Sequence, residues 1–99
     1  MIPAACSLDE TGLRRQLERY QATGAGARVL HRDRRRISIR VGDGAESAVI
    51  EELIAVEHEC CPFYTLEWDR LQRALTVAVS TPDHERALDA IAYALGLEP

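Results

Sequence analysis

The sequence predicts an α+β fold in which three helices pack on a four-stranded, mostly antiparallel sheet. Apolar residues recur at helical spacing in three segments and alternate with polar residues in three shorter runs. A fourth short run, residues 28–32, has Val29 as its clearest inward candidate. Turn-forming residues join those runs in pairs. The predicted order is therefore α-β-β-α-β-β-α. Two hairpins joined by a helix favour one sheet covered by helices, ferredoxin-like in layout but with an altered order of elements.

Length and composition suit a single domain over residues 1–99. The chain is 46% hydrophobic and 28% charged, as expected for a globular protein with a modest core. No linker, low-complexity tract or sequence repeat stands out, although the pattern of elements itself repeats.

The first helix is predicted to begin at a capping box, with Ser7 as N-cap and Glu10 reaching back to it. Gly24 and Gly26 are expected to end this helix. Its apolar stripe consists of Leu13, Leu17 and Tyr20.

Two strands are predicted next, at residues 28–32 and 36–41, with a turn around Asp33 between them. One face of the second strand carries Ile37, Ile39 and Val41. The basic run over residues 31–36 is of a kind that can bind nucleic acid. We interpret it as a solvated hairpin tip, because no aromatic residue is interleaved and the whole chain is acidic.

The second helix is predicted to begin with Asp43 and Glu46 as its capping pair and to end before Pro62. Strands follow at residues 64–69 and 74–80, and small residues on one face of the latter leave room for a helix or a partner subunit. The core-facing residues of the second helix are Val49, Ile50, Leu53 and Ile54.

The closing helix is predicted to start at Thr81, with Pro82 in the first helical position, and to end at Gly96. Its buried stripe consists of Leu88, Ile91, Ala92 and Leu95.

The clearest candidate site lies at the end of the second helix, in the motif Glu-His-Glu-Cys-Cys-Pro-Phe over residues 57–63. Glu57 stands where a leucine is expected, three residues before Cys60 and four before Cys61. The three side chains therefore share one helix face, and His58 lies on its flank. An acid beside two thiols favours a soft-metal or reactive-thiol site. The alternative is that the cysteines act as small hydrophobes.

A third thiol, Cys6, precedes the first helix, where the positive end of the helix dipole favours thiolate. Stacking of the two helix–hairpin halves would bring Cys6 towards Cys60 and Cys61. The alternative is that Cys6 is an incidental residue near the terminus.

Charge and cysteine count restrict the partners and the compartment. The net charge of −4 argues against nucleic-acid binding, and three cysteines give no disulfide framework. The first residues lack the pattern of a signal peptide, and no apolar run is long enough to span a bilayer. We therefore expect a cytoplasmic protein without nucleic-acid or membrane partners.

The chain resembles, over most of its length, a group of small bacterial proteins associated with heavy-metal, chiefly mercury-type, resistance. Members occur alone or appended to MerR-like regulators. The resemblance rests on Cys6-Ser7-Leu8, followed by Arg14 and Arg15, and on the Cys-Cys-Pro-Phe motif within residues 57–63. It implies that the functional positions are Cys6, Cys60 and Cys61, with Glu57 and Glu59 as the acidic positions. This chain lacks a DNA-binding helix-turn-helix, which argues against a regulator.

The leading hypothesis is that Cys6, Cys60 and Cys61 bind a soft thiophilic ion such as mercury, zinc or copper. Glu57, or less favourably His58, would be a fourth ligand or a hydrogen-bond acceptor beside the ligands. One alternative is a dimerising interaction module with inert cysteines, which would pair through a sheet edge or the small-residue strand face. The other is a thiol enzyme acting on an organomercurial or a disulfide, with Glu57 as proton shuttle. The enzyme is less favoured, because only His58 is close and the helix dipole opposes the thiolate.

Overall fold

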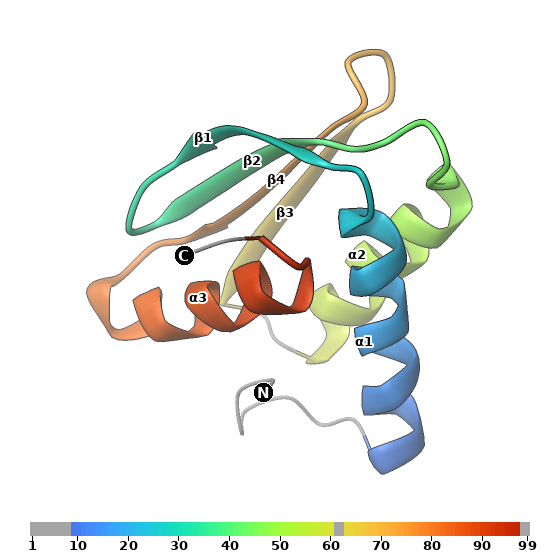
Figure 1. Cartoon of the computed structure of the whole chain (residues 1–99). Coiled ribbons are helices and arrows are strands. Elements are labelled where there is room, and N and C mark those ends of the chain that lie inside the picture. Colours follow the sequence, from blue (N-terminus) through green and yellow to red (C-terminus); the bar gives the residue numbers. More distant parts are fainter. Residues whose placement is uncertain (1–8, 61–62, 98–99) are drawn as a thin grey trace.

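Two hairpins, each entered from a helix, supply the strands of one sheet (Figure 1). The structure is a computed structural model, in which residues 9–60 and 63–97 are described. Its elements confirm the predicted order: α1 (Glu10–Gly24), β1 (Arg28–Arg32), β2 (Arg36–Arg40), α2 (Ser47–Cys60), β3 (Tyr64–Asp69), β4 (Ala74–Val79), a 3₁₀ turn η1 (Pro82–His84) and α3 (Glu85–Ala94).

The four strands form a sheet of order β1-β2-β4-β3, with every neighbouring pair antiparallel. The inner strands β2 and β4 come from different hairpins and pair with Ser38 opposite Thr76 and Ile39 opposite Leu75. This register is favoured because the apolar residues of both strands then lie on one face, and a slip by one residue would expose them.

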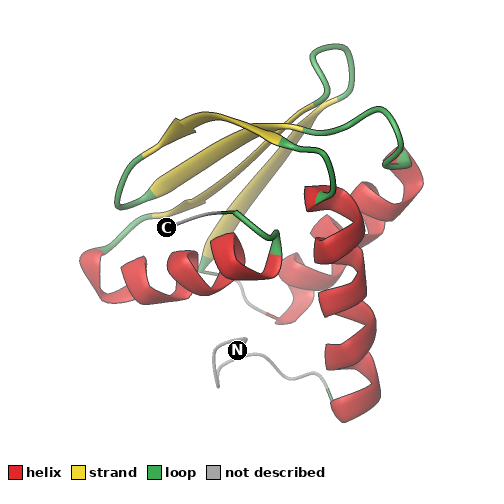
Figure 2. Cartoon of the chain, viewed as in Figure 1, coloured by secondary structure: helices red, strands yellow, loops and turns green. Residues whose placement is uncertain are grey.

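The described helices lie on one face of the sheet (Figure 2). Alternation along the strands turns the apolar residues towards them, while the polar residues of β2 and β3 lie on the opposite face. The core between the two layers includes Ile37, Ile39, Leu66, Leu75 and Val77 from the sheet and Ile50, Leu53, Leu88 and Ile91 from the helices. These residues confirm the α+β class. Among residues 9–60 and 63–97, no helix is both long and apolar enough to cross a membrane.

The predicted cap of the first helix is wrong. α1 begins at Glu10, and its N-cap is Asp9, whose Oδ1 accepts a hydrogen bond from the Gly12 amide at 2.7 Å. An aspartate caps as well as a serine, and its charge also complements the helix dipole. Ser7 lies outside the described residues.

The predicted cap of the second helix is also wrong, because α2 begins at Ser47 and Asp43 lies in the preceding turn. The reason is a clamp from the β3–β4 hairpin. Arg73 Nη2 donates to the carbonyl oxygens of Gly42 at 2.8 Å and Ala45 at 2.6 Å. The guanidinium also lies 5.7 Å from the ring centroid of Trp68. Arg73 therefore fixes the turn that leads into α2.

The first helix buries a different face from the predicted stripe. Tyr20 is fully buried, but its neighbours on the buried face are Gln16 and Thr23, while Leu13 and Leu17 are only partly buried. The reason is that α1 packs mainly on α2 and α3, with its first turns extending away from the sheet (Figure 1). The expectation of an apolar stripe is therefore only partly right.

The closing helix is entered through a 3₁₀ turn rather than starting directly at Pro82. Its predicted buried stripe is confirmed, and Gly96 adopts a positive φ of 78° after its last turn. The end of α1 abuts this helix end closely. A Cβ on Gly24 would fall far inside van der Waals contact with the Leu95 carbonyl, so only glycine fits there.

Candidate functional site

Glu57 is the centre of the candidate site. It continues the core-facing side of α2 after Ile50 and Leu53, and 0% of its surface is exposed. The prediction that a carboxylate replaces a leucine on this buried face is confirmed. A buried carboxylate is costly unless it is hydrogen-bonded or paired with a cation, so its surroundings decide what it does.

Two side chains of α1 donate to the same oxygen of this carboxylate. Tyr20 OH lies 2.8 Å from Glu57 Oε1, and Gln16 Nε2 lies 3.1 Å from it. Gln16 Nε2 also donates to the Leu53 carbonyl of α2 at 3.0 Å. The carboxylate is thus held in one orientation by the neighbouring helix.

A chain of polar contacts leads from this carboxylate to the surface. Gln16 Oε1 accepts a hydrogen bond from Arg19 Nη1 at 2.9 Å, and Arg19 Nη2 pairs with Glu52 Oε1 at 3.0 Å. Because Arg19 fixes the Gln16 carbonyl, the Gln16 amide is turned towards Glu57. The orientation of the buried acid therefore depends on a half-exposed ion pair between α1 and α2.

The second carboxylate oxygen is different. Glu57 Oε2 is buried and has no hydrogen-bond partner among the described residues. Orphaned buried polar atoms are uncommon in folded proteins, and a charged one calls for a donor or a cation. This atom is the strongest indication of chemistry in the described part of the chain.

The motif residues around Glu57 lie at different depths. Cys60, one turn later, is a free, half-buried thiol that packs at the edge of the core. His58 and Glu59 are exposed, so His58 does not share the buried face of Glu57. Cys6 and Cys61 lie outside the described residues. Within residues 9–60 and 63–97, no group of three metal-ligating side chains is assembled.

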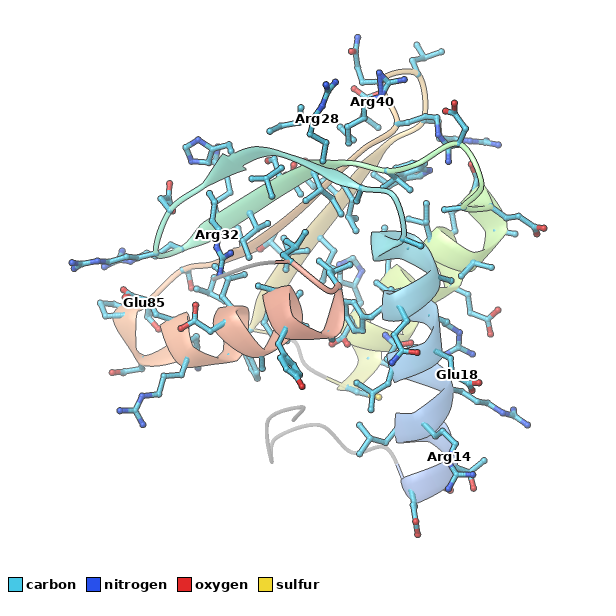
Figure 3. All side chains as sticks on the ribbon, in the orientation of Figure 1. Arg14, Glu18, Arg28, Arg32, Arg40 and Glu85 are labelled. Atoms are coloured by element: carbon cyan, nitrogen blue, oxygen red, sulfur yellow. The ribbon has the colours of Figure 1, made fainter. Side chains whose placement is uncertain are left out.

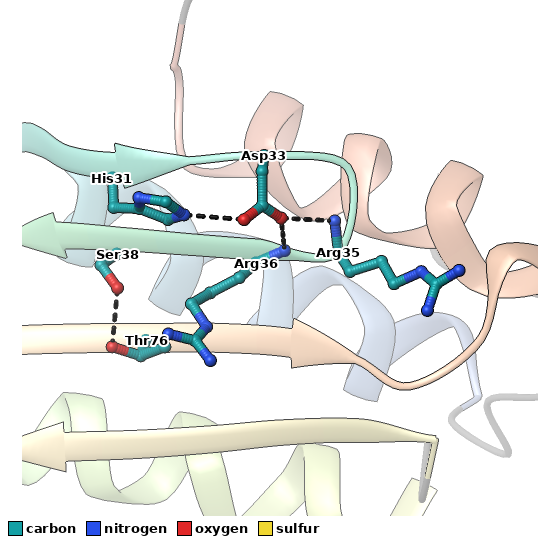
Figure 4. A network of polar contacts seen from close by, with 6 residues as sticks. All are labelled: His31, Asp33, Arg35, Arg36, Ser38 and Thr76. Carbon is teal, nitrogen blue, oxygen red and sulfur yellow. Dashed lines mark hydrogen bonds and ion pairs between the residues drawn. The ribbon is translucent and has the colours of Figure 1, made fainter.

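The other two histidines take part in local contacts. His84 stacks on Phe63 with ring centroids 4.4 Å apart. His31 Nε2 lies 2.7 Å from Asp33 Oδ2 at the β1–β2 hairpin tip, where Asp33 Oδ1 also accepts from the Arg35 and Arg36 amides (Figure 4). The hydrogen bond from His31, followed by those from the two amides, lowers the pKa of Asp33 below its ordinary value of 3.8.

A cavity of about 580 Å³ opens between α1 and α3, apart from Glu57. Its lining is uncharged and mostly apolar: Leu17, Gln21, Ala90, Ile91, Tyr93, Ala94, Gly96 and Leu97. It contributes no ligand for a soft metal, so it is not part of the candidate site.

Sequence reasoning missed Gln16 and Tyr20 as partners of the site. Both lie on one helix face at four-residue spacing, and a glutamine in register with a buried tyrosine is the only local signal. Their meeting with Glu57 depends on how α1 packs on α2, which no short motif encodes. Comparisons of the chain with protein-family models, curated proteins and solved structures found no match.

Proposed function

We propose that the protein binds a soft thiophilic metal ion, such as mercury, zinc or copper, through cysteine thiolates at the end of α2. Cys60 and Cys61 are the first ligands in this proposal, and Cys6 is the third. Glu57 is a fourth ligand or a hydrogen-bond acceptor beside the ligands. The role is metal resistance or sequestration in a reducing cytoplasm, where thiols stay free.

The unpartnered Oε2 of Glu57 is the observation that carries the proposal. One oxygen of this carboxylate is held by Tyr20 and Gln16, and the other is left over in a buried position. Cys60 lies one turn after Glu57 on the same helix, and its thiol is half-buried. A cation at this helix end would give that oxygen a partner.

The location also favours a metal over a free reactive thiolate. Cys60 is the last residue of α2, and the negative end of the helix dipole is a favourable place for a cation. His58, the nearest basic side chain in the sequence, is exposed. A soft ion stabilises thiolate directly by coordination, so it does not depend on a neighbouring base.

The test is titration of the reduced protein with Hg(II), Zn(II) and Cu(I) in turn, following thiolate-to-metal absorption and the loss of free thiols. We expect stoichiometric binding that is abolished in Cys60→Ser and Cys61→Ser. Glu57→Gln should weaken it about 10–100-fold, as for groups that support metal ligands. Glu51→Gln is the matched control, because Glu51 is an exposed carboxylate of the same helix.

The Cys6→Ser variant determines the number of thiols. Weaker binding in this variant supports a three-cysteine site, and unchanged binding restricts the site to Cys60 and Cys61. Thermal unfolding of each metal-free variant separates a lost ligand from a damaged fold. Absence of binding in the micromolar range would overturn the proposal.

A further inference from the structure

On the sheet face opposite the helices, basic and acidic side chains lie on different strands. Its side chains follow from strand alternation and cross-strand register: Arg28 and His31 on β1, Arg36, Ser38 and Arg40 on β2, Ala74, Thr76 and Ala78 on β4, and Thr65, Glu67 and Asp69 on β3. We call this set the open face. Figure 3 shows Arg28 and Arg40 pointing away from the helices.

The open face is basic on β1 and β2, small on β4 and acidic on β3. The register aligns Arg28, Arg40, Ala74 and Asp69 in one row across the sheet. The next row runs from His31 through Ser38 and Thr76 to Glu67. Ser38 Oγ and Thr76 Oγ1 lie 2.9 Å apart, so the central hydroxyls already have a partner within the chain (Figure 4).

The charges at the two sides are not neutralised within the chain. Arg28, Arg40 and Glu67 are exposed and form no ion pair with another of residues 9–60 and 63–97. Three strand spacings, about 14 Å, separate β1 from β3, which is too far for direct pairing across the face. A partner that covers the face must therefore present acid to one side and base to the other.

We propose that the occupant of this face is a second copy of the chain, in a face-to-face dimer whose twofold axis runs along the strands between β2 and β4. In this dimer each strand runs in the same direction as the strand of the partner that it faces, and the order of the strands across the sheet is reversed. It lays the basic β1 side of each copy over the acidic β3 side of the other. A twofold axis across the strands instead places β1 over β1, where the arginines repel.

Shape agrees with this choice of axis. Each β2 strand then lies over a partner β4 strand, so the long Arg36 and Arg40 side chains cover Ala78 and Ala74. Arg28 faces Asp69, and symmetry forms that contact twice. Sheets packed this way stay within about 30° of alignment, which preserves these rows near the axis.

Nucleic acid fits the open face less well, because a phosphate backbone would meet Glu67 and Asp69 on one side. Edge-to-edge pairing is disfavoured at β1, where the register shifts between Val29 and His31 and a bulge interrupts the outer edge. Strands of five or six residues give a face roughly 20 Å on each side, so the dimer would bury roughly 800 Å² in total, in the range of weak and transient interfaces. We expect a dimer of micromolar affinity.

The experiment is sedimentation equilibrium of the full chain from micromolar to millimolar concentration, with a reductant and a chelator present. Neither disulfides nor bridging metal can then link two chains, so the result is independent of the metal-binding proposal. The unmodified protein should dimerise, and added salt should weaken the dimer. Arg28→Glu and Asp69→Arg should each raise the dimer Kd about tenfold, since symmetry doubles every change.

The double variant Arg28→Glu with Asp69→Arg should restore dimerisation, because it reverses both partners of the intermolecular pair. Ala78→Arg should abolish it, because the new side chain would fill the space over β4 that the partner's Arg36 occupies and would repel it. Arg86→Glu, an equal charge change on exposed α3 surface, is the control. Asp69 also accepts from the Gln72 amide at 3.1 Å, so thermal unfolding must show that each variant is folded. A monomer throughout the concentration range, or a dimer insensitive to these substitutions, would overturn the proposal.

Discussion

Gln16 of α1 donates a hydrogen bond to Glu57 of α2 at 3.1 Å, although 41 residues separate them in the chain. Both side chains have 0% of their surface exposed. The two helices are therefore joined by a hydrogen bond at a buried position where apolar side chains usually pack. Such a contact stabilises the packing of α1 on α2 and also fixes the orientation of the two helices, because a buried hydrogen-bonded pair tolerates little rotation.

Replacing Gln16 by leucine keeps the volume and removes every hydrogen bond of the side chain. We expect Gln16→Leu to lower the free energy of unfolding by about 1–3 kcal/mol, because Glu57 and the Leu53 carbonyl each lose a donor. Chemical denaturation measures the change. Gln21→Leu, at an exposed position of the same helix, should have little effect. Equal losses in both variants would contradict the role of the buried pair.

Replacing Gly24 by alanine tests the contact between α1 and the end of α3. The added methyl group overlaps the Leu95 backbone, which cannot move without shifting α3. We expect a loss of about 1–3 kcal/mol or more in stability, as for an overpacked core. Gly44→Ala is the control, since no atom of the described residues lies within 4 Å of a Cβ there. It should be neutral or slightly stabilising, because alanine restricts the unfolded chain.

Replacing Arg73 by alanine tests the clamp on the turn before α2. The carbonyls of Gly42 and Ala45 would lose their side-chain donor, and Trp68 would lose its guanidinium neighbour. We expect a loss of about 1–3 kcal/mol, measured by thermal or urea unfolding. Arg70→Ala, an exposed substitution in the same hairpin turn, should cost much less. A small effect at Arg73 would mean that the turn holds its conformation without the clamp.

Asp33 makes stability depend on pH at the hairpin tip. Its pKa in the folded protein is lowered from 3.8, chiefly by the His31 hydrogen bond and then by the Arg35 and Arg36 amides. A lowered pKa means that the stabilisation is present above the unfolded value and is lost as the pH falls through the folded value. The Asp33→Asn variant can still accept hydrogen bonds from the two amides, but it has no carboxyl group to protonate. This loss of stability at acid pH should therefore disappear in the variant.

The measurement is the free energy of unfolding of wild type and Asp33→Asn between neutral pH and acid. The two curves should converge as the pH falls below 3.8. Asp89→Asn, at an exposed position on α3, is the control and should parallel the wild-type curve. Parallel curves for wild type and Asp33→Asn would show that the hairpin tip contributes no pH dependence.

Much of the fold follows from periodicity. The strand over residues 64–69 and the buried stripe of α3 are where alternation and helical spacing predict them, because each buries its apolar residues on one side. The helix starts were less predictable. Asp9 and Ser7 are both suitable caps, and Asp43 loses its expected role to a tertiary contact from Arg73.

The candidate site was also predictable only in part. The position of Glu57 on the buried face follows from the spacing within α2, and that prediction is confirmed. Its partners could not be predicted, because Gln16 lies off the apolar stripe that identifies a buried helix face, and Tyr20 lies on that stripe as an ordinary core residue. The proximity of Cys6 and Cys61 to Cys60 stays a prediction.

The pairing of β2 with β4 joins the two helix–hairpin units through their inner strands. The register is symmetric, since Arg36 pairs with Ala78, Ser38 with Thr76 and Arg40 with Ala74. Each unit consists of a helix, an outer strand and an inner strand, and the two inner strands pair with each other. Severing residues 42–46 would leave two fragments with exposed inner strands, each able to complete its sheet only by reassociating with the other.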